Sequence, residues 1–149
     1  MSLTHQPSPW FDYPVRVHPH HTDYAGVVWH GSYLVWMEEA RIKMFRDVGL
    51  NYADLVKLGC ELPVINLSLR YRQAIKMGEV GTVKTRIASL TQVQICCDQH
   101  IYCEHHPKPY ILGQVTLVPV KLATGRILRQ YPEPLQSALT KLLASERRG

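Results

Sequence analysis

The spacing of apolar residues changes along the chain from a helical period to a strand period. Residues 32–48 contain no proline or glycine, and apolar side chains recur there every three or four positions, which predicts a helix that ends at Gly49. Further apolar residues lie off this stripe, so we expect other elements to surround the helix. They are Tyr33, Val35, Trp36, Ala40 and Ile42. A short second helix is predicted from an N-cap at Asn51 to Gly59.

The second half of the chain predicts four strands in succession. The first alternates apolar and polar positions, which is typical of a strand with one buried face, with apolar residues at Ile65, Leu67, Leu69 and Tyr71. Turn residues separate it from three more strands, over residues 80–90, 93–104 and 110–122. A strand over residues 13–18 precedes the long helix, and an amphipathic helix beginning at Pro134 follows the last strand.

This order of elements predicts an α+β protein in which an antiparallel sheet is wrapped around one long central helix. The 149 residues suit a single domain, which we place at residues 12–149 after a flexible tail over residues 1–11. Such a sheet leaves long edge strands, and pairing with a second copy protects them. We therefore expect a homodimer or a homotetramer.

Composition narrows the class of protein only in part. The formal charge of +5 is scattered, apart from a run at residues 146–149 that we interpret as a solvated tail, and no RNA-binding motif accompanies it. No apolar run has the length of a signal peptide or a membrane span, so we expect a cytoplasmic protein without a membrane partner. The four cysteines lack CxxC spacing, and we expect them to be reduced and mostly buried.

The segment between the first strand and the long helix carries the candidate chemistry. Asp23 precedes the start of the helix, where backbone N–H groups have no intrahelical acceptor and favour negative charge. A carboxylate there can act as a general base or a nucleophile on a carbonyl, while the N–H groups stabilise the resulting oxyanion. The alternative is a structural role for Asp23 in a turn, because Asp and Gly commonly share turns.

The order of elements resembles that of the hot-dog-fold acyl-CoA thioesterases of the 4-hydroxybenzoyl-CoA thioesterase family, over about residues 13–131. The most specific match is the pattern Asp23-x-x-Gly26-Val27-Val28-x-His30-x-x-Tyr33. The resemblance implies that Asp23 is the catalytic carboxylate, that backbone N–H groups near His30 and Gly31 polarise the thioester carbonyl, and that the acyl pocket lies between two subunits. The His30 ring could also act directly, or the residue could lend only its main chain.

Three further residues are assigned to substrate binding, namely Gly26, Tyr33 and Glu38. Glu38 is chosen over Glu39 because Glu39 stands four residues before Lys43, the spacing of a helical ion pair. The chain departs from many relatives at Pro19 and His21, where those relatives carry an aromatic residue and a second acid.

The resemblance implies hydrolysis of an acyl-CoA with no cofactor, since coenzyme A is part of the substrate. Two short segments, Leu62-Pro63-Val64 and Cys96-Cys97-Asp98, resemble the branch that hydrolyses 1,4-dihydroxy-2-naphthoyl-CoA (DHNA-CoA) in phylloquinone synthesis. We therefore expect an aromatic acyl-CoA. The alternatives are 4-hydroxybenzoyl-CoA, a short aliphatic acyl-CoA, or a non-catalytic module that binds acyl-CoA or acyl carrier protein.

The histidines raise the question of a metal or nucleic-acid site. His18, His20, His21 and His30 are close in sequence, but Pro19 interrupts the strand and no HExxH pattern or cysteine partner completes a site, so we expect no metal. A second histidine group is expected at the surface, namely His100, His105 and His106. For the CoA phosphates, the sequence leaves five basic candidates open: Arg70, Arg72, Lys76, Lys84 and Arg86.

Overall fold

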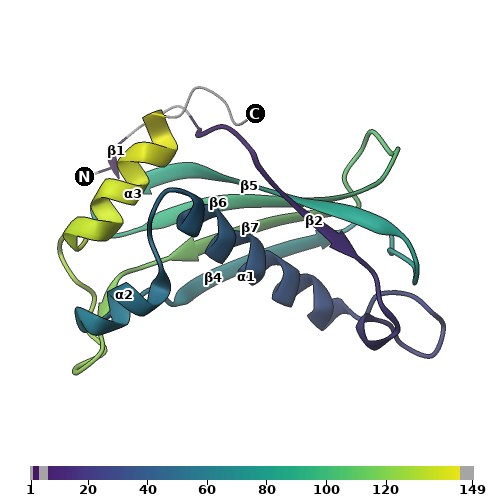
Figure 1. Cartoon of the computed structure of the whole chain (residues 1–149), viewed down its shortest axis with the longest axis horizontal. Helices are drawn as coiled ribbons and strands as arrows, with labels where there is room; N and C mark the ends of the chain where they lie inside the picture. The colour runs from purple at the N-terminus through teal and green to yellow at the C-terminus, as the bar shows by residue number, and fades with distance from the viewer. Residues whose placement is uncertain (1, 4–6, 145–149) are drawn as a thin grey trace.

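A computed structural model describes residues 2–3 and 7–144, and its elements follow the predicted order (Figure 1). The elements are β1 (Ser2–Leu3), β2 (Phe11–Arg16), the 3-10 turn η1 (Pro19–His21), α1 (His30–Asp47), α2 (Tyr52–Lys57), β3 (Cys60–Glu61), β4 (Val64–Tyr71), β5 (Val80–Thr91), β6 (Ile95–Cys103), β7 (Ile111–Leu117), β8 (Val120–Lys121) and α3 (Glu133–Ala144). The α+β class is confirmed. Within the described residues, no helix combines the length and apolar content that crossing a membrane requires.

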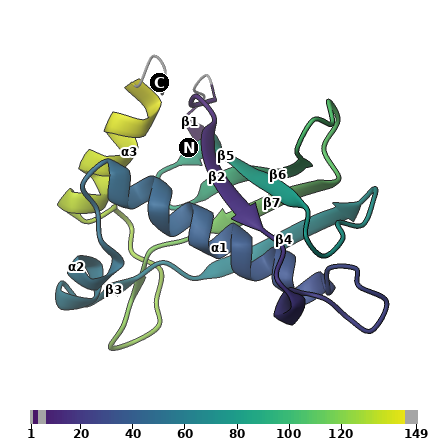
Figure 2. The same cartoon turned by 45° about the vertical axis from the view of Figure 1, so that its right-hand side comes forward.

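The main sheet is antiparallel, with β5, β6, β7 and β4 as consecutive neighbours. β2 pairs with β5 over residues 80–85, and β1 pairs with the far end of β5 at Leu90–Thr91. α1 runs across one face of this sheet, while α3 lies at one end of the molecule (Figures 1 and 2). β3 and β8 form a separate two-stranded ribbon.

The core lies between α1 and the facing side of the sheet. Inward residues of β5, β6 and β7 are buried at alternate positions, as the period-2 pattern predicted. α1 buries mainly apolar side chains against them, including Tyr33, Trp36, Met37, Met44 and Phe45. The expectation that other elements surround α1 is only partly met, because Leu34 and Val35 remain exposed on its outer side. A single sheet of this chain covers one side of the helix.

A buried polar cluster joins α1 to the middle of the sheet. Gln99 is fully buried in β6; its Oε1 accepts a hydrogen bond from Nη1 of Arg41 at 2.9 Å. Its Nε2 donates to the Met37 carbonyl at 2.9 Å and to the Thr85 hydroxyl at 2.8 Å. Burial raises the pKa of the nearby Tyr52 to about 12, against the opposing effect of Arg41. Because no carboxylate of a described residue pairs with Arg41, the cation depends on neutral oxygen acceptors.

β4 differs from the strand predicted for residues 65–71. Its alternation was expected to bury one face, but the two apolar residues Ile65 and Leu67 are 51% and 43% exposed. The reason is its position: β4 pairs only with β7 and forms the outer edge of the sheet. The apolar row is therefore present, but no element described in this chain covers it.

The N-terminal segment is also different from the prediction. Residues 1–11 were expected to form a flexible tail, but Ser8 is buried and exchanges hydrogen bonds with the backbone of Ile87, at 3.0 Å and 2.8 Å. Trp10 lies over the Arg86 guanidinium at 4.2 Å from ring centroid to Cζ. The tail prediction is therefore wrong for residues 7–11. Residues 1 and 4–6 lie outside the described residues, as does the basic run at 146–149.

Candidate functional site

Asp23 opens a tight turn between η1 and α1. One carboxylate oxygen, Oδ1, accepts hydrogen bonds from the N–H groups of Ala25 at 2.8 Å and Val27 at 3.4 Å. The main chain closes the turn with an Asp23 N–H to Val27 carbonyl bond of 2.9 Å. Gly26 has a φ of +76°, a left-handed conformation that glycine adopts without strain. The structural role considered for Asp23 is thus present, and it uses only one of the two carboxylate oxygens.

The start of α1 provides the expected N–H donors. The helix begins at His30, two residues before the prediction, with Trp29 at the N-cap position. The N–H of Ser32 donates to the Trp29 carbonyl at 2.8 Å, whereas those of His30 and Gly31 have no acceptor among the described residues. A Cβ at Gly31 would overlap the Trp29 indole, so only glycine allows this indole to lie against the first turn. The two N–H groups are available to bind an oxyanion.

A cavity of about 530 Å³ brings Asp23 and the start of α1 together. Asp23, His30 and Tyr33 all line it, as the sequence pattern predicted. The opposite wall comes from the end of β4 and the following segment: Tyr71, Arg72, Gln73 and Ala74. Of these residues the sequence had indicated only Arg72, as one of five candidates for the CoA phosphates. The rings of Tyr33 and Tyr71 lie 5.7 Å apart between centroids, and Trp29 adds a third aromatic side chain. The volume and the aromatic lining suit a small organic group.

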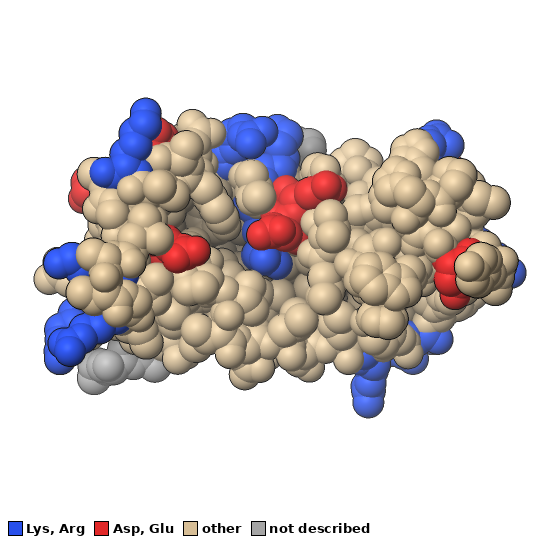
Figure 3. Space-filling view, turned by 90° about the horizontal axis from the view of Figure 1, so that it is seen from below, with Lys and Arg blue, Asp and Glu red and all other residues tan. Residues whose placement is uncertain are grey.

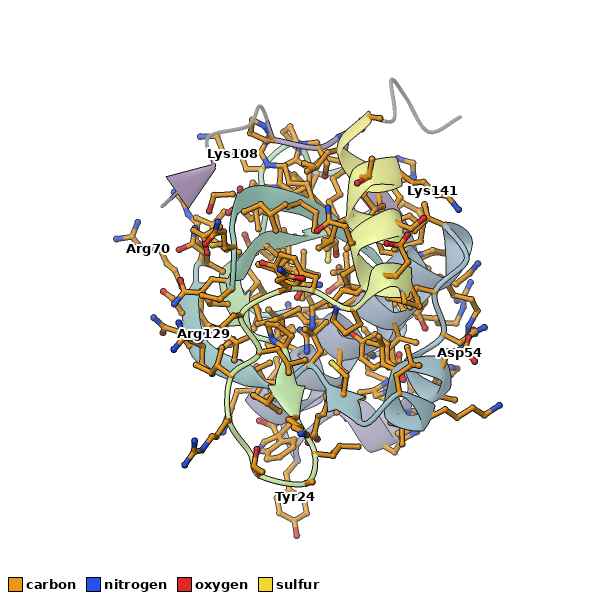
Figure 4. All side chains as sticks on the ribbon, turned by 90° about the vertical axis from the view of Figure 1, so that its left-hand side faces the viewer. Tyr24, Asp54, Arg70, Lys108, Arg129 and Lys141 are labelled. Atoms are coloured by element: carbon orange, nitrogen blue, oxygen red, sulfur yellow. The ribbon has the colours of Figure 1, made fainter. Side chains whose placement is uncertain are left out.

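Two residues that the sequence assigned to substrate binding lie outside the lining of this cavity. Glu38 is exposed and does not line the cavity, because it lies two helical turns beyond His30. Gly26 does not line it either; it shapes the Asp23 turn and accepts a hydrogen bond from the Met77 N–H at 2.9 Å. Tyr24, at the tip of the same turn, points away from the body of the molecule (Figure 4).

The ion pair predicted between Glu39 and Lys43 is also wrong. Glu39 accepts a hydrogen bond from the hydroxyl of Tyr13 in β2 at 3.1 Å, while Lys43 pairs with Asp47 one turn further along. α1 crosses close to β2, which supplies a partner that helical spacing alone does not reveal. This contact anchors the middle of α1 to the sheet.

The structure separates the basic candidates. Arg72 lines the cavity and forms no ion pair with a described residue. Lys84 pairs with Asp12 at 2.9 Å and Arg86 pairs with Asp98 at 3.0 Å. Arg70 extends into solvent away from the ribbon (Figure 4). Asp98, part of the segment that resembled the DHNA-CoA branch, is thus an ion-pair residue, and it is absent from the cavity lining.

The histidines before Asp23 form a compact group. The ring centroids of His20 and His21 are 4.0 Å apart, and His18 lies within 6 Å of both. Burial lowers the pKa of His21, and the neighbouring rings lower it further. Within the described residues, neither these three rings nor any other three His, Cys, Asp or Glu side chains are arranged so that they could hold a metal ion. A wider hollow of about 780 Å³ beside α3 is lined by none of the candidate residues.

The antiparallel sheet packed on one long helix is the hot-dog fold of thioester hydrolases. The family model described as the Thioesterase-like superfamily matches residues 17–140, and the chain belongs to this family. A Synechocystis protein provisionally named an esterase is 46% identical over 133 residues, which are 89% of this chain and 80% of that protein.

Two other similar proteins have more specific names. The acyl-CoA thioester hydrolase YbgC of Escherichia coli is 29% identical over 91 residues, 61% of this chain and 68% of that protein. The crystal structure of a DHNA-CoA thioesterase from Staphylococcus aureus superposes with a TM-score of 0.82 at 27% identity, covering 91% of each chain. The predicted fold and the predicted enzyme class are confirmed.

Proposed function

We propose that this protein hydrolyses the thioester of an aromatic acyl-CoA, and that Asp23 and the first turn of α1 act on its carbonyl. The observation that carries the proposal is the cavity in which Asp23, His30 and Tyr33 meet beneath aromatic side chains. Thioester hydrolysis requires a carboxylate and oxyanion donors, and here Asp23 and His30 line one cavity, with Gly31 following His30 in the first turn of α1.

The reaction requires a nucleophile to attack the acyl carbon and coenzyme A to leave it. Asp23 removes a proton from a water that attacks the acyl carbon, or attacks it directly to form a mixed anhydride that water then cleaves. In both routes the carbon–sulfur bond breaks and coenzyme A leaves as a thiolate, which takes up the proton that the water releases and becomes a thiol with an ordinary pKa near 8.5. The rest of the water adds to the acyl group, which leaves as a carboxylic acid. The N–H groups of His30 and Gly31 stabilise the oxyanion, and loss of one such donor typically costs about 3 kcal/mol.

For the acyl group we propose DHNA-CoA. Support comes from the aromatic walls of the cavity and from the similarity to the Staphylococcus aureus enzyme. Arg72 lines the same cavity and forms no ion pair with a described residue, so it is suited to a CoA phosphate. The competing substrates are 4-hydroxybenzoyl-CoA and short aliphatic acyl-CoA esters. All of these substrates are acyl-CoA thioesters, the class in the name of the similar protein YbgC.

We also propose that two copies pair through β4. Its outer edge, which no strand among the described residues pairs, carries the exposed apolar residues Ile65 and Leu67. Figure 3 shows the molecule from below the view of Figure 1. On this face, residues other than Lys, Arg, Asp and Glu cover most of the surface. Tyr71 ends this strand and lines the cavity, so pairing would close the acyl pocket against the second subunit.

For the cell compartment we propose the cytoplasm. All four cysteines are free thiols in the structure, which a reducing compartment maintains.

The function is tested by comparing the wild type with Asp23→Asn on a panel of naphthoyl, benzoyl and short aliphatic CoA esters. The release of free thiol measures hydrolysis. The amide keeps an oxygen in the place of Oδ1, so the turn through Ala25 and Val27 is retained. Turnover should fall by about a hundredfold or more while ester binding persists. Unchanged turnover would refute the role of Asp23. Saturable binding by the wild type without thiol release would favour a binding module, including one for acyl carrier protein.

A further inference from the structure

One backbone carbonyl joins the segment before Asp23 to the start of α1. The carbonyl of His21 accepts the Trp29 N–H at 2.8 Å and the Ser32 hydroxyl at 3.0 Å. Ser32 is only 7% exposed, and its hydroxyl points back to η1 instead of capping its own helix. The Asp23 turn lies in the sequence between His21 and Trp29, and a β-bridge between Thr22 and Val28 closes it.

The ring of His21 makes two further contacts that hold η1 in place. Its Nδ1 accepts the N–H of His18 at 2.9 Å, and the ring meets the buried indole of Trp36 edge to face, 5.0 Å between centroids. The His21 ring therefore ties η1 both to His18, the residue at its N-cap, and to the second turn of α1. Because the carbonyl and the ring belong to one residue, the position of the carboxylate turn and that of the helix start are coupled.

We propose that His21 and Ser32 are positioning residues, which together set the separation between the Asp23 carboxylate and the free N–H groups of His30 and Gly31. The proposal rests on the proposed hydrolysis at Asp23. Neither residue lines the cavity, so their action is on geometry and not on substrate contact. Misplacement of reacting groups by about 1 Å can cost about a hundredfold in rate, which makes such coupling large enough to measure.

The arrangement requires a neutral His21 ring. A protonated Nδ1 cannot accept the His18 N–H, and the added charge would face His18 and His20 on the same turn. From α1, the carboxylate of Glu39 opposes this effect, although it also accepts the Tyr13 hydroxyl from β2. Acid should therefore loosen η1 and lower turnover before it unfolds the protein.

The first experiment compares Ser32→Ala with Ser8→Ala, since both serines are buried and hydrogen-bonded to backbone. With a CoA ester that the wild type hydrolyses, Ser32→Ala should lower kcat about tenfold or more, with KM changed less than about twofold. Ser8→Ala should leave kcat unchanged, because Ser8 lies on the sheet at Ile87. Ser32→Thr should restore part of the loss, since it returns the hydroxyl.

The second experiment measures the pH profile of kcat for His21→Asn. The asparagine side chain offers an oxygen to the His18 N–H and does not titrate near neutrality, so the acid limb should move to lower pH. This variant also tests the proposal if Ser32→Ala does not fold.

The outcomes separate the two proposals. A wild type that hydrolyses no ester would overturn the function. An active wild type with equal kcat in folded Ser32→Ala, or an unmoved acid limb in His21→Asn, would overturn the positioning role and leave the function of Asp23 intact.

Discussion

Replacement of Gln99 by leucine should destabilise the protein strongly through the buried cation that Gln99 supports. Gln99 is fully buried, and Arg41 is 7% exposed with its Nε lacking any partner in the structure. Gln99→Leu removes the Nη1 acceptor at 2.9 Å, and a hydrogen bond to a charged group contributes about 1.5–3 kcal/mol. The two bonds to Met37 and Thr85 contribute about 1 kcal/mol each.

The expected loss is therefore about 3–5 kcal/mol in the free energy of unfolding, a fall of about 10 °C in Tm for a chain of this size. Thermal and urea unfolding followed by far-UV circular dichroism would measure it. A matched control is Gln114→Leu. The Gln114 amide bonds to Asp98 at 3.2 Å on the exposed face of β7, and its loss should change stability by less than about 0.5 kcal/mol.

The decisive comparison adds Arg41→Met. Once the cation is removed as well, Gln99→Leu no longer leaves a buried charge unsupported, so the double variant should be more stable than the sum of the single losses by about 2 kcal/mol. Additivity within about 0.5 kcal/mol would refute the reasoning, because it would show that Gln99 and Arg41 do not depend on each other.

Three further outcomes are expected. Leu67→Lys should convert a dimer into a monomer in sedimentation velocity, whereas Leu122→Lys, equally exposed at 43% but next to the separate β3–β8 ribbon and outside the main sheet, should not; a monomeric wild type would contradict pairing through β4. Arg72→Gln should raise KM for a CoA ester about tenfold, while Arg86→Gln on the opposite face should leave it unchanged, and equal effects would exclude a specific phosphate contact. Burial lowers the pKa of His100, so the unfolded chain binds more protons; the free energy of unfolding should decline below about pH 6.5, and less steeply in His100→Gln, as urea unfolding at pH 5 and 7 would show.

The family match establishes part of the function, and the experiments above test the rest. The thioesterase-like fold and the enzyme class are established by the match over residues 17–140, whereas Asp23, the acyl group and the second subunit are proposals. Asp23 stabilises its own turn by accepting the Ala25 N–H, in addition to its proposed catalytic role. Substitutions that keep the turn, such as Asp23→Asn, are for that reason more informative than Asp23→Ala.

The sequence alone predicted those features that depend on neighbouring residues. The helical period of 32–48, the alternation in 65–71 and the glycine of the Asp23 turn are local patterns, and they correctly placed α1, β4 and the turn before α1. The ends were less accurate: α1 begins two residues earlier, and the strand expected over 110–122 divides into β7 and β8 around Pro119, which has no N–H to donate.

Tertiary structure decided which distant groups meet. The wall of the cavity at Tyr71 and Arg72 faces Asp23 because β4, forty residues further along the chain, returns beside α1 at the edge of the sheet. The partners of Glu39 and Arg41 come from β2 and β6, so helical spacing could not identify them. Periodicity specifies which face of an element is apolar, but it carries no information about which element, or which second chain, covers that face. This is why the sequence identified the carboxylate and the helix, and only the fold selected the residues that surround them.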